Sequence, residues 1–224
     1  MDKLLALKKE QQSGISVIQI VREEYEMVLL NRIFDSNMGK KLVFRGGTAL
    51  RLAYGSPRFS DDLDFSQLED IKVRDFQDWC RLTAEFNPNL ELVEALKKQF
   101  TLFALYKVKD PAIPATISIK IEISRRLEGF KKDKDYILMR LKSEITPLTV
   151  LAQVASLERI EKEKRSISPF RIRDIFDLWF IGQKLDKKYP MDFSGLNAKE
   201  VKRELNRLLT IGSRRLIEPW LPKE

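Results

Sequence analysis

The segment from residue 116 to residue 124 alternates polar side chains with isoleucines, and no other pattern constrains the fold as strongly. Successive side chains of a β-strand point to opposite faces, so the isoleucines would share one face and the polar residues the other. We therefore expect a half-buried strand of a sheet here. Pro111 and Pro114 would separate it from a preceding strand over residues 100–108, as in a hairpin-like connection.

The rest of the N-terminal part is expected to alternate helices and strands. Apolar residues at helical spacing predict helices over residues 16–34 and 73–86, and Pro88 would end the second. Thr48 would cap a short helix that reaches about residue 52. Further strands are expected over residues 42–44, 62–66 and 136–141.

After residue 142 the spacing of apolar residues is helical to the end of the chain. Thr146-Pro147 favours a helix start, because threonine caps a helix and proline is tolerated at its first position. Helices are expected over residues 146–164, 170–185 and 198–209. The predicted fold class is α+β: a mixed sheet with flanking helices over residues 1–145, followed by a helical domain over residues 146–224.

The composition excludes several kinds of chemistry. The chain has no histidine and one cysteine, which rules out Ser-His-Asp and Cys-His catalysis and an ordinary zinc site. Cys80 is expected to be a small core residue. No apolar run is long enough to span a membrane, and the N-terminus lacks a signal peptide's apolar stretch. A cytoplasmic location without a membrane partner is therefore expected.

The charge balance favours polyanionic partners. Lys and Arg number 41 against 33 Asp and Glu, which gives a net charge of +8. Nucleic acid or nucleotides would suit this charge, although a surface rich in both signs explains it equally well. Basic clusters that could hold RNA lie at Arg125-Arg126, at Lys131-Lys132 and near the C-terminus. The C-terminal cluster consists of Lys199, Lys202, Arg203, Arg207, Arg214 and Arg215.

The stretch from Gly46 to Asp64 carries the residues expected to do chemistry. Gly46 and Gly47 would let the backbone approach a triphosphate. The Thr48 hydroxyl and the helix that begins there would donate to phosphate oxygens. Asp62 and Asp64 lie two apart on a strand, so both side chains project to one face, where they could hold Mg²⁺.

A neighbouring strand offers the residues that would complete this site. Glu122 is the best candidate for a third metal-binding carboxylate, and Lys120 would point to the same face and meet triphosphate charge. Two metal ions held in this way could activate an attacking hydroxyl and steady a departing pyrophosphate. The sequence therefore predicts metal-dependent nucleotidyl transfer.

Two resemblances narrow this prediction. Gly47-Thr48, thirteen intervening residues and Asp62-Leu63-Asp64 resemble the signature of the DNA polymerase β-like nucleotidyltransferase superfamily. The stretches from Arg45 to Arg51, from Arg58 to Phe65 and from Arg173 to Leu178 together are similar to the AbiEii toxin family, the nucleotidyltransferase toxins of type IV toxin–antitoxin systems. The similarity spans roughly residues 40–180.

The AbiEii resemblance implies a set of partners and roles. It implies transfer of a nucleotide from a nucleoside triphosphate to an RNA acceptor, with tRNA 3′ ends as the targets of some members, and a separately encoded antitoxin. It also implies that Asp174 belongs to the active site. The residues expected to bind the nucleotide are Gly46, Gly47, Thr48, Arg51 and Asp177.

One position departs from the family pattern. Members carry a lysine in the helix that precedes the Arg-Asp-x-x-Asp element, whereas the helix expected here has Val154 at the matching place. Lys120, or else Lys162 or Lys164, would then have to contact the phosphates. Two alternatives stay open: transfer of the nucleotide to a protein hydroxyl, and a catalytically silent module that binds nucleotides or nucleic acid.

Overall fold

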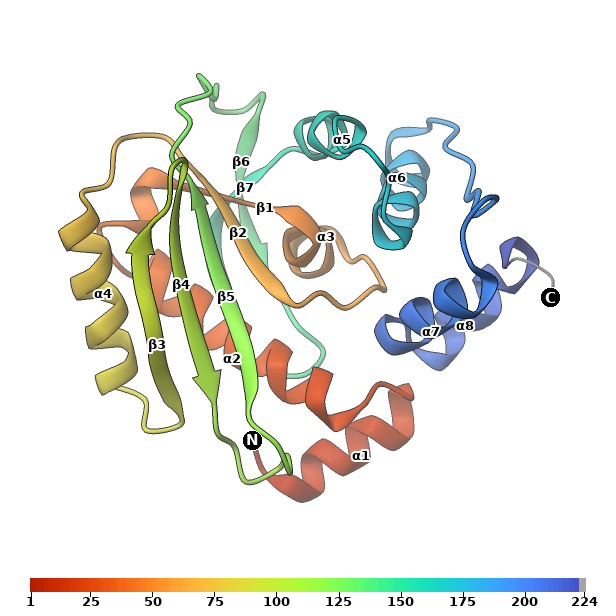
Figure 1. Cartoon of the computed structure of the whole chain (residues 1–224), viewed down its shortest axis with the longest axis horizontal. Helices are drawn as coiled ribbons and strands as arrows, with labels where there is room; N and C mark the ends of the chain where they lie inside the picture. The colour runs from red at the N-terminus through yellow and green to blue at the C-terminus, as the bar shows by residue number, and fades with distance from the viewer. Residues whose placement is uncertain (222–224) are drawn as a thin grey trace.

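A computed structural model describes residues 1–221, and its centre is a seven-stranded mixed sheet in the order β3-β4-β5-β2-β1-β7-β6 (Figure 1). The strands are β1 (Leu42–Arg45), β2 (Asp62–Gln67), β3 (Leu90–Lys97), β4 (Thr101–Val108), β5 (Ile117–Ser124), β6 (Tyr136–Leu141) and β7 (Val150–Ala155). β2 runs parallel to β5 and β1 parallel to β7, while the other neighbours are antiparallel. The predicted α+β class is confirmed.

Helices cover both faces of this sheet. They are α1 (Lys3–Ser13), α2 (Val17–Phe34), α3 (Gly46–Tyr54), α4 (Val73–Glu85), α5 (Leu157–Arg165), α6 (Ile172–Leu185), α7 (Ala198–Leu208) and α8 (Ile211–Ile217), with two short 3₁₀ turns at Gly39–Lys41 and Glu218–Trp220. In Figure 1, α2 and α4 lie along the sheet, whereas α5 to α8 form a separate group beside α3. No helix among the described residues is long and apolar enough to cross a membrane.

The two faces of the central strands have opposite character, as the alternation in β5 predicts. The apolar side chains of β2 and β5, such as Leu63 and Ile121, are fully buried in the main core, which α2 and α4 also line. Cys80 of α4 lies in this core, as expected. A second core joins Leu50 of α3 to Phe176 of α6 and Leu205 of α7. The polar face of β2 and β5 lies on the side of this second core.

The helix predicted over residues 146–164 is wrong, because its first half is strand β7. β7 pairs with β6 along its length and meets β1, with Val154 opposite Phe44. Val150, Ala152 and Val154 alternate into the main core, and burial between two strands outweighs the helix-start pattern of Thr146-Pro147. The helix starts at α5, where the Ser156 side chain accepts a hydrogen bond from the backbone N–H of Arg159.

Three further elements are absent from the sequence prediction: α1, α8 and β3. β3 forms the edge of the sheet and most of its residues are exposed or half-buried, so its sequence lacks the apolar alternation that reveals a strand. Because β7 belongs to the sheet, we propose to place the boundary between sheet and helical parts at Ser156 rather than at residues 145 and 146.

Candidate active site

Two adjacent parallel strands bring the predicted carboxylates together. In the register of β2 and β5, Asp62 lies opposite Lys120 and Asp64 lies opposite Glu122. All four side chains therefore belong to one face of the sheet. The ammonium nitrogen of Lys120 is 3.8 Å from a carboxylate oxygen of Asp62, and both side chains are partly exposed.

The acidity of Asp64 reflects its burial. Burial raises the pKa of Asp64 to about 6; the positive charge of Arg45 opposes the rise, and the negative charges of Asp62 and Glu122 add to it. A cation bound beside Asp64 would favour its ionised form and oppose the effect of burial.

The start of α3 is packed directly against Asp64. Gly46 has a φ of 81°, and a Cβ atom there would lie 2.5 Å from Oδ2 of Asp64. A Cβ atom on Gly47 would clash with the Arg58 guanidinium, which two hydrogen bonds to Asp177 hold in place, and would lie 2.8 Å from the Ser60 hydroxyl oxygen. Both positions therefore require glycine. No side chain caps this helix, and Gly46 and Gly47 line a cleft, so the first backbone N–H groups of α3 lie at that cleft.

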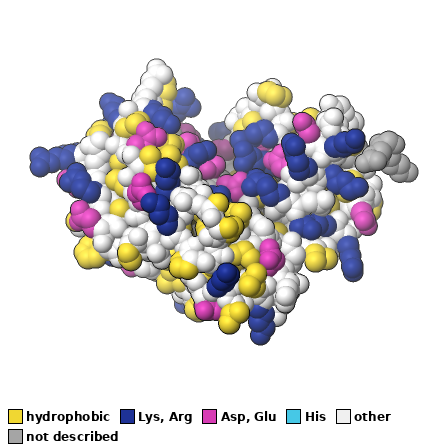
Figure 2. Space-filling view, turned by 60° about the horizontal axis from the view of Figure 1, so that its bottom comes forward, with side chains coloured by type: hydrophobic (Ala, Val, Ile, Leu, Met, Phe, Trp, Pro, Cys, Tyr) yellow, Lys and Arg dark blue, Asp and Glu magenta, His cyan; other side chains and the backbone are white. Residues whose placement is uncertain are grey.

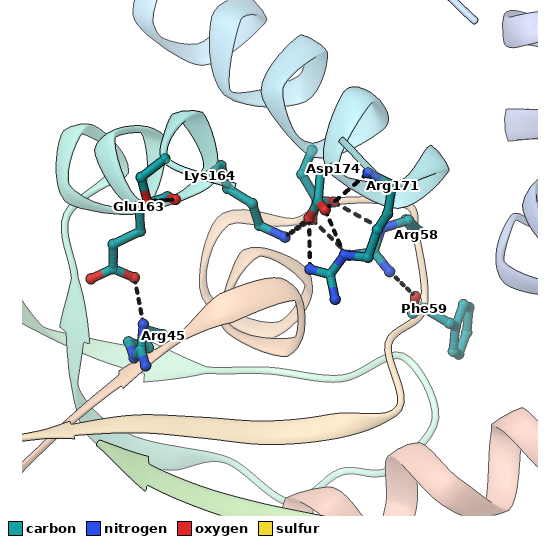
Figure 3. Close-up of polar contacts among 9 residues, drawn as sticks. Arg45, Arg58, Phe59, Glu163, Lys164, Arg171 and Asp174 are labelled. Carbon is teal, nitrogen blue, oxygen red and sulfur yellow. Dashed lines mark hydrogen bonds and ion pairs between the residues drawn. The ribbon is translucent and has the colours of Figure 1, made fainter. Parts of the chain in front are cut away.

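Two buried carboxylates and three cations form a network beside the cleft (Figure 3). The Lys164 ammonium of α5 is 2.7 Å from Asp174 Oδ1 and 2.6 Å from Asp177 Oδ2, both on α6. Arg171 donates two hydrogen bonds to Asp174, and Arg58 donates two to Asp177. The side chains of both aspartates are 0% exposed. The network therefore fixes the position of Lys164.

The acidity of the two aspartates reflects these contacts. Burial alone would raise the pKa of Asp174, but hydrogen bonds from Arg171 and the charge of Lys164 outweigh it and lower the pKa to about 2. For Asp177, burial is likewise outweighed by Arg58 and Lys164, and its pKa is lowered. Both carboxylates are thus ionised at neutral pH, which keeps the network intact.

The cleft itself lies between the sheet and α5 and has a volume of about 620 Å³. Arg45, at the end of β1, donates a 2.9 Å hydrogen bond to Glu163 of α5 across it. Basic side chains dominate its walls. They are Arg45, Arg126, Arg159, Lys162, Lys164 and Arg171. A space of this size, with Asp64 at one wall and the start of α3 beside it, can hold a polyanionic ligand such as a triphosphate.

The donor set also suits a divalent cation. Carboxylate oxygens are the ligands that Mg²⁺ takes from proteins. Within residues 1–221, however, no three His, Cys, Asp or Glu side chains gather as a preassembled metal cluster. The register of β2 and β5 places Asp64 and Glu122 side by side, with Asp62 two residues away. The three carboxylates therefore lie on one face of the sheet, where they could hold such an ion.

A sequence model of a known family matches the chain from residue 28 to residue 208, and its description reads "Nucleotidyl transferase AbiEii toxin, Type IV TA system". The chain belongs to the AbiEii family. It is therefore a nucleotidyltransferase of the toxin type, and the predicted resemblance is confirmed. No functionally curated protein sequence matches the chain.

Solved structures share this AbiEii fold. JHP933 from Helicobacter pylori is 23% identical over 75% of this chain and 68% of its own, with a TM-score of 0.55. The nucleotidyltransferase toxin MenT4 from Mycobacterium tuberculosis H37Rv is 18% identical over 92% of this chain and 69% of its own, with a TM-score of 0.56. At these identities the likeness concerns the fold.

The structure places Val154 outside the helix that precedes the Arg-Asp-x-x-Asp element. Val154 lies on β7 and is fully buried in the main core, on the face of the sheet opposite Asp64. The helix that precedes the Arg-Asp-x-x-Asp element is α5, and its lysine at the network is Lys164. Of the three lysines offered as alternatives, Lys164 is the one that contacts Asp174 and Asp177.

Three residues expected to bind the nucleotide make other contacts within the protein. The Thr48 hydroxyl donates a 2.5 Å hydrogen bond to the backbone carbonyl of Asp62, so it holds β2 instead of pointing at a phosphate. Arg51 pairs with the buried Glu23 of α2 at 2.8 Å and lies outside the cleft. Asp177 is buried against Arg58 and Lys164. We therefore propose a supporting role for all three side chains.

For Asp174 we propose a similar supporting role. Its carboxylate is fully buried and accepts hydrogen bonds from Arg171 and Lys164, so it positions these cations and touches no ligand space itself. Arg58, Arg45 and Glu163 were not singled out from the sequence. Arg58 stands within the quoted Arg58-Phe59-Ser60-Asp61 stretch, but its buried partner lies 119 residues away, which no local pattern reveals.

Proposed function

We propose that this nucleotidyltransferase transfers a nucleoside monophosphate from a nucleoside triphosphate to RNA, with tRNA as the expected acceptor. One observation carries the proposal: Asp64, the open start of α3 and the fixed Lys164 all border the same basic cleft. Such a cleft offers donors for phosphate oxygens and carboxylates for divalent cations side by side.

Each group has a defined task in this proposal. The N–H groups at Gly46 and Gly47, together with Lys164, bind and orient the triphosphate. Asp62, Asp64 and Glu122 hold Mg²⁺, which when bound supplies positive charge to the transferring phosphoryl group. The AbiEii assignment supports a nucleoside triphosphate as substrate and an antitoxin as partner.

The basic surface supports RNA as the acceptor. The chain carries a net charge of +8. Figure 2 shows a hollow between the sheet part and the C-terminal helices, with Lys and Arg side chains gathered at its edges and acidic side chains inside it. Phosphate contacts at such a surface are independent of sequence and sensitive to salt.

The test is to incubate the protein with Mg²⁺ and each of the four α-labelled triphosphates, and with either total tRNA or a protein lysate. We expect label in tRNA. Asp62→Ala should abolish it, whereas Asp70→Ala, whose side chain is 62% exposed after β2, should not. Label in protein alone would contradict the RNA acceptor and support transfer to a protein hydroxyl. RNA binding without label from any triphosphate would indicate a silent binding module.

A further inference from the structure

A second pocket lies on the other side of the carboxylate pair. Asp64 borders the cleft described above, whereas Asp62 borders a pocket of about 510 Å³ that shares none of the cleft's lining residues. α2, β5, α6 and α7 contribute its basic side chains. They are Arg22, Lys120, Arg173, Arg203 and Arg207. The two aspartates of one strand therefore face two separate spaces.

Two of these cations already share one carboxylate partner, Asp61. Arg207 pairs with Asp61 at 2.9 Å, and Arg22 lies 3.5 Å from the same carboxylate. Gln19 donates a further 2.8 Å hydrogen bond to Asp61. The hydrogen bonds from Arg207 and Gln19 outweigh burial and lower the pKa of Asp61. Asp61 thus ties α2 and α7 to the start of β2 and builds one wall of the pocket.

The other cations are available to a ligand. In the part of the chain that the structure describes, Arg173 and Arg203 have no ion-pair or hydrogen-bond partner for their side chains, and the Nε atom of Arg173 is buried without an acceptor. Lys120 has only the 3.8 Å contact with Asp62. A buried donor without an acceptor costs free energy, so the pocket is suited to an anion that supplies one.

We propose that this pocket binds the sugar–phosphate backbone of the acceptor RNA next to its reacting 3′-hydroxyl, with Arg173 and Arg203 on the phosphates. The inference rests on the proposed function and adds the direction of approach: nucleotide from the Asp64 side, acceptor from the Asp62 side. It also divides the C-terminal basic cluster. Arg203 lines the pocket, whereas Arg214 donates hydrogen bonds to the backbone carbonyls of Gly14 and Leu209.

The chemistry of transfer favours two spaces on opposite sides of the carboxylates. The 3′-hydroxyl oxygen forms a bond to the α-phosphorus while the bond from that phosphorus to pyrophosphate breaks, and the hydroxyl proton passes to water. Attacking and leaving oxygens stand roughly in line, so acceptor and pyrophosphate must occupy opposite sides of the α-phosphorus. A single cleft beside Asp64 would not separate them in this way.

The test compares Arg173→Gln and Arg203→Gln with Lys184→Gln, a matched control on α6 that removes one exposed charge outside the pocket. Steady-state transfer is measured with tRNA and triphosphate varied separately, and affinity for tRNA without triphosphate by fluorescence anisotropy. The pocket variants should raise both the KM and the Kd for tRNA roughly tenfold, and tRNA binding should depend less steeply on salt. Their KM for triphosphate should stay within about twofold of the unmodified protein's. Lys184→Gln should match the unmodified protein.

The outcomes separate this inference from the proposed function. If tRNA is labelled but the pocket variants behave like Lys184→Gln, the acceptor pocket is wrong and the function stands. If tRNA is not labelled, the proposed function fails, but the anisotropy measurement still tests tRNA binding at the pocket. Weaker tRNA binding by Arg203→Gln than by Lys184→Gln would support that binding, and equal binding would overturn it. A raised KM for triphosphate instead of tRNA would assign the pocket to the nucleotide.

Discussion

Arg58 and Asp177 are joined by two parallel hydrogen bonds of 2.8 and 2.9 Å, although 119 residues separate them in the chain. Both side chains are almost fully buried, at 1% and 0% exposed. The pair connects the loop before β2 to α6. β2 carries Asp62 and Asp64, and the α6 residues Asp174 and Asp177 bind Lys164 of α5. This contact therefore helps to fix the carboxylates relative to the lysine.

Replacing Arg58 by methionine should lower the free energy of unfolding by about 3–5 kcal/mol, because Asp177 would keep a buried charge with one partner fewer. Urea denaturation measures this. Arg81→Met is the control, since the Arg81 pair with Asp78 is exposed and should change stability by less than about 1 kcal/mol. Equal effects of the two substitutions would contradict a structural role for the Arg58 pair.

Asp174 should make the free energy of unfolding depend on pH. Its folded pKa of about 2 lies below the ordinary value of 3.8, so the ionised form stabilises the fold above pH 4 and this contribution is lost as pH falls toward 2. Asp174→Asn should therefore be less stable than the unmodified protein by roughly 2–3 kcal/mol at pH 7. Denaturation at pH 7, 4 and 2.5 should show the difference shrinking at low pH; a constant difference would refute the linkage.

Lys164→Met should reduce kcat/KM for nucleotidyl transfer on the order of 100- to 1000-fold, as expected when a fixed cation beside the transferring group is removed. Arg165→Met on the same helix is the matched control, because Arg165 does not line the cleft. Circular dichroism would show whether both variants fold. Transfer that is as fast in Lys164→Met as in Arg165→Met would exclude Lys164 from the reaction.

Local patterns predicted the residues on the sheet but not the network behind them. The alternation in β2 and β5 was enough to place Asp64 and Glu122 on one face, because strand geometry has a period of two. The sequence predicts a helix at Val154, whereas the structure has a strand, because a short apolar run has the same pattern in a buried strand and in a buried helix. Arg58 could not be predicted, because its role depends on contact with a distant helix.

Mg²⁺ should stabilise the folded protein through the carboxylates of β2 and β5. In thermal unfolding, millimolar Mg²⁺ should raise Tm, because an ion that binds only the folded state shifts the equilibrium toward it. Asp64→Asn should remove most of this shift and also raise Tm in metal-free buffer at pH 7.5, where burial and like charges disfavour the ionised carboxylate. A full Mg²⁺ response in Asp64→Asn would place the ion elsewhere.

The central claim is that Asp62 and Asp64 carry nucleotidyl transfer, and labelling of tRNA from an α-labelled triphosphate by Asp64→Asn tests it most directly. The substitution keeps the size of the side chain and removes its charge. Relative to the unmodified protein, and with Asp70→Asn as the control, the account predicts that the initial rate falls at least roughly 1000-fold. A rate within tenfold of the unmodified protein would contradict it.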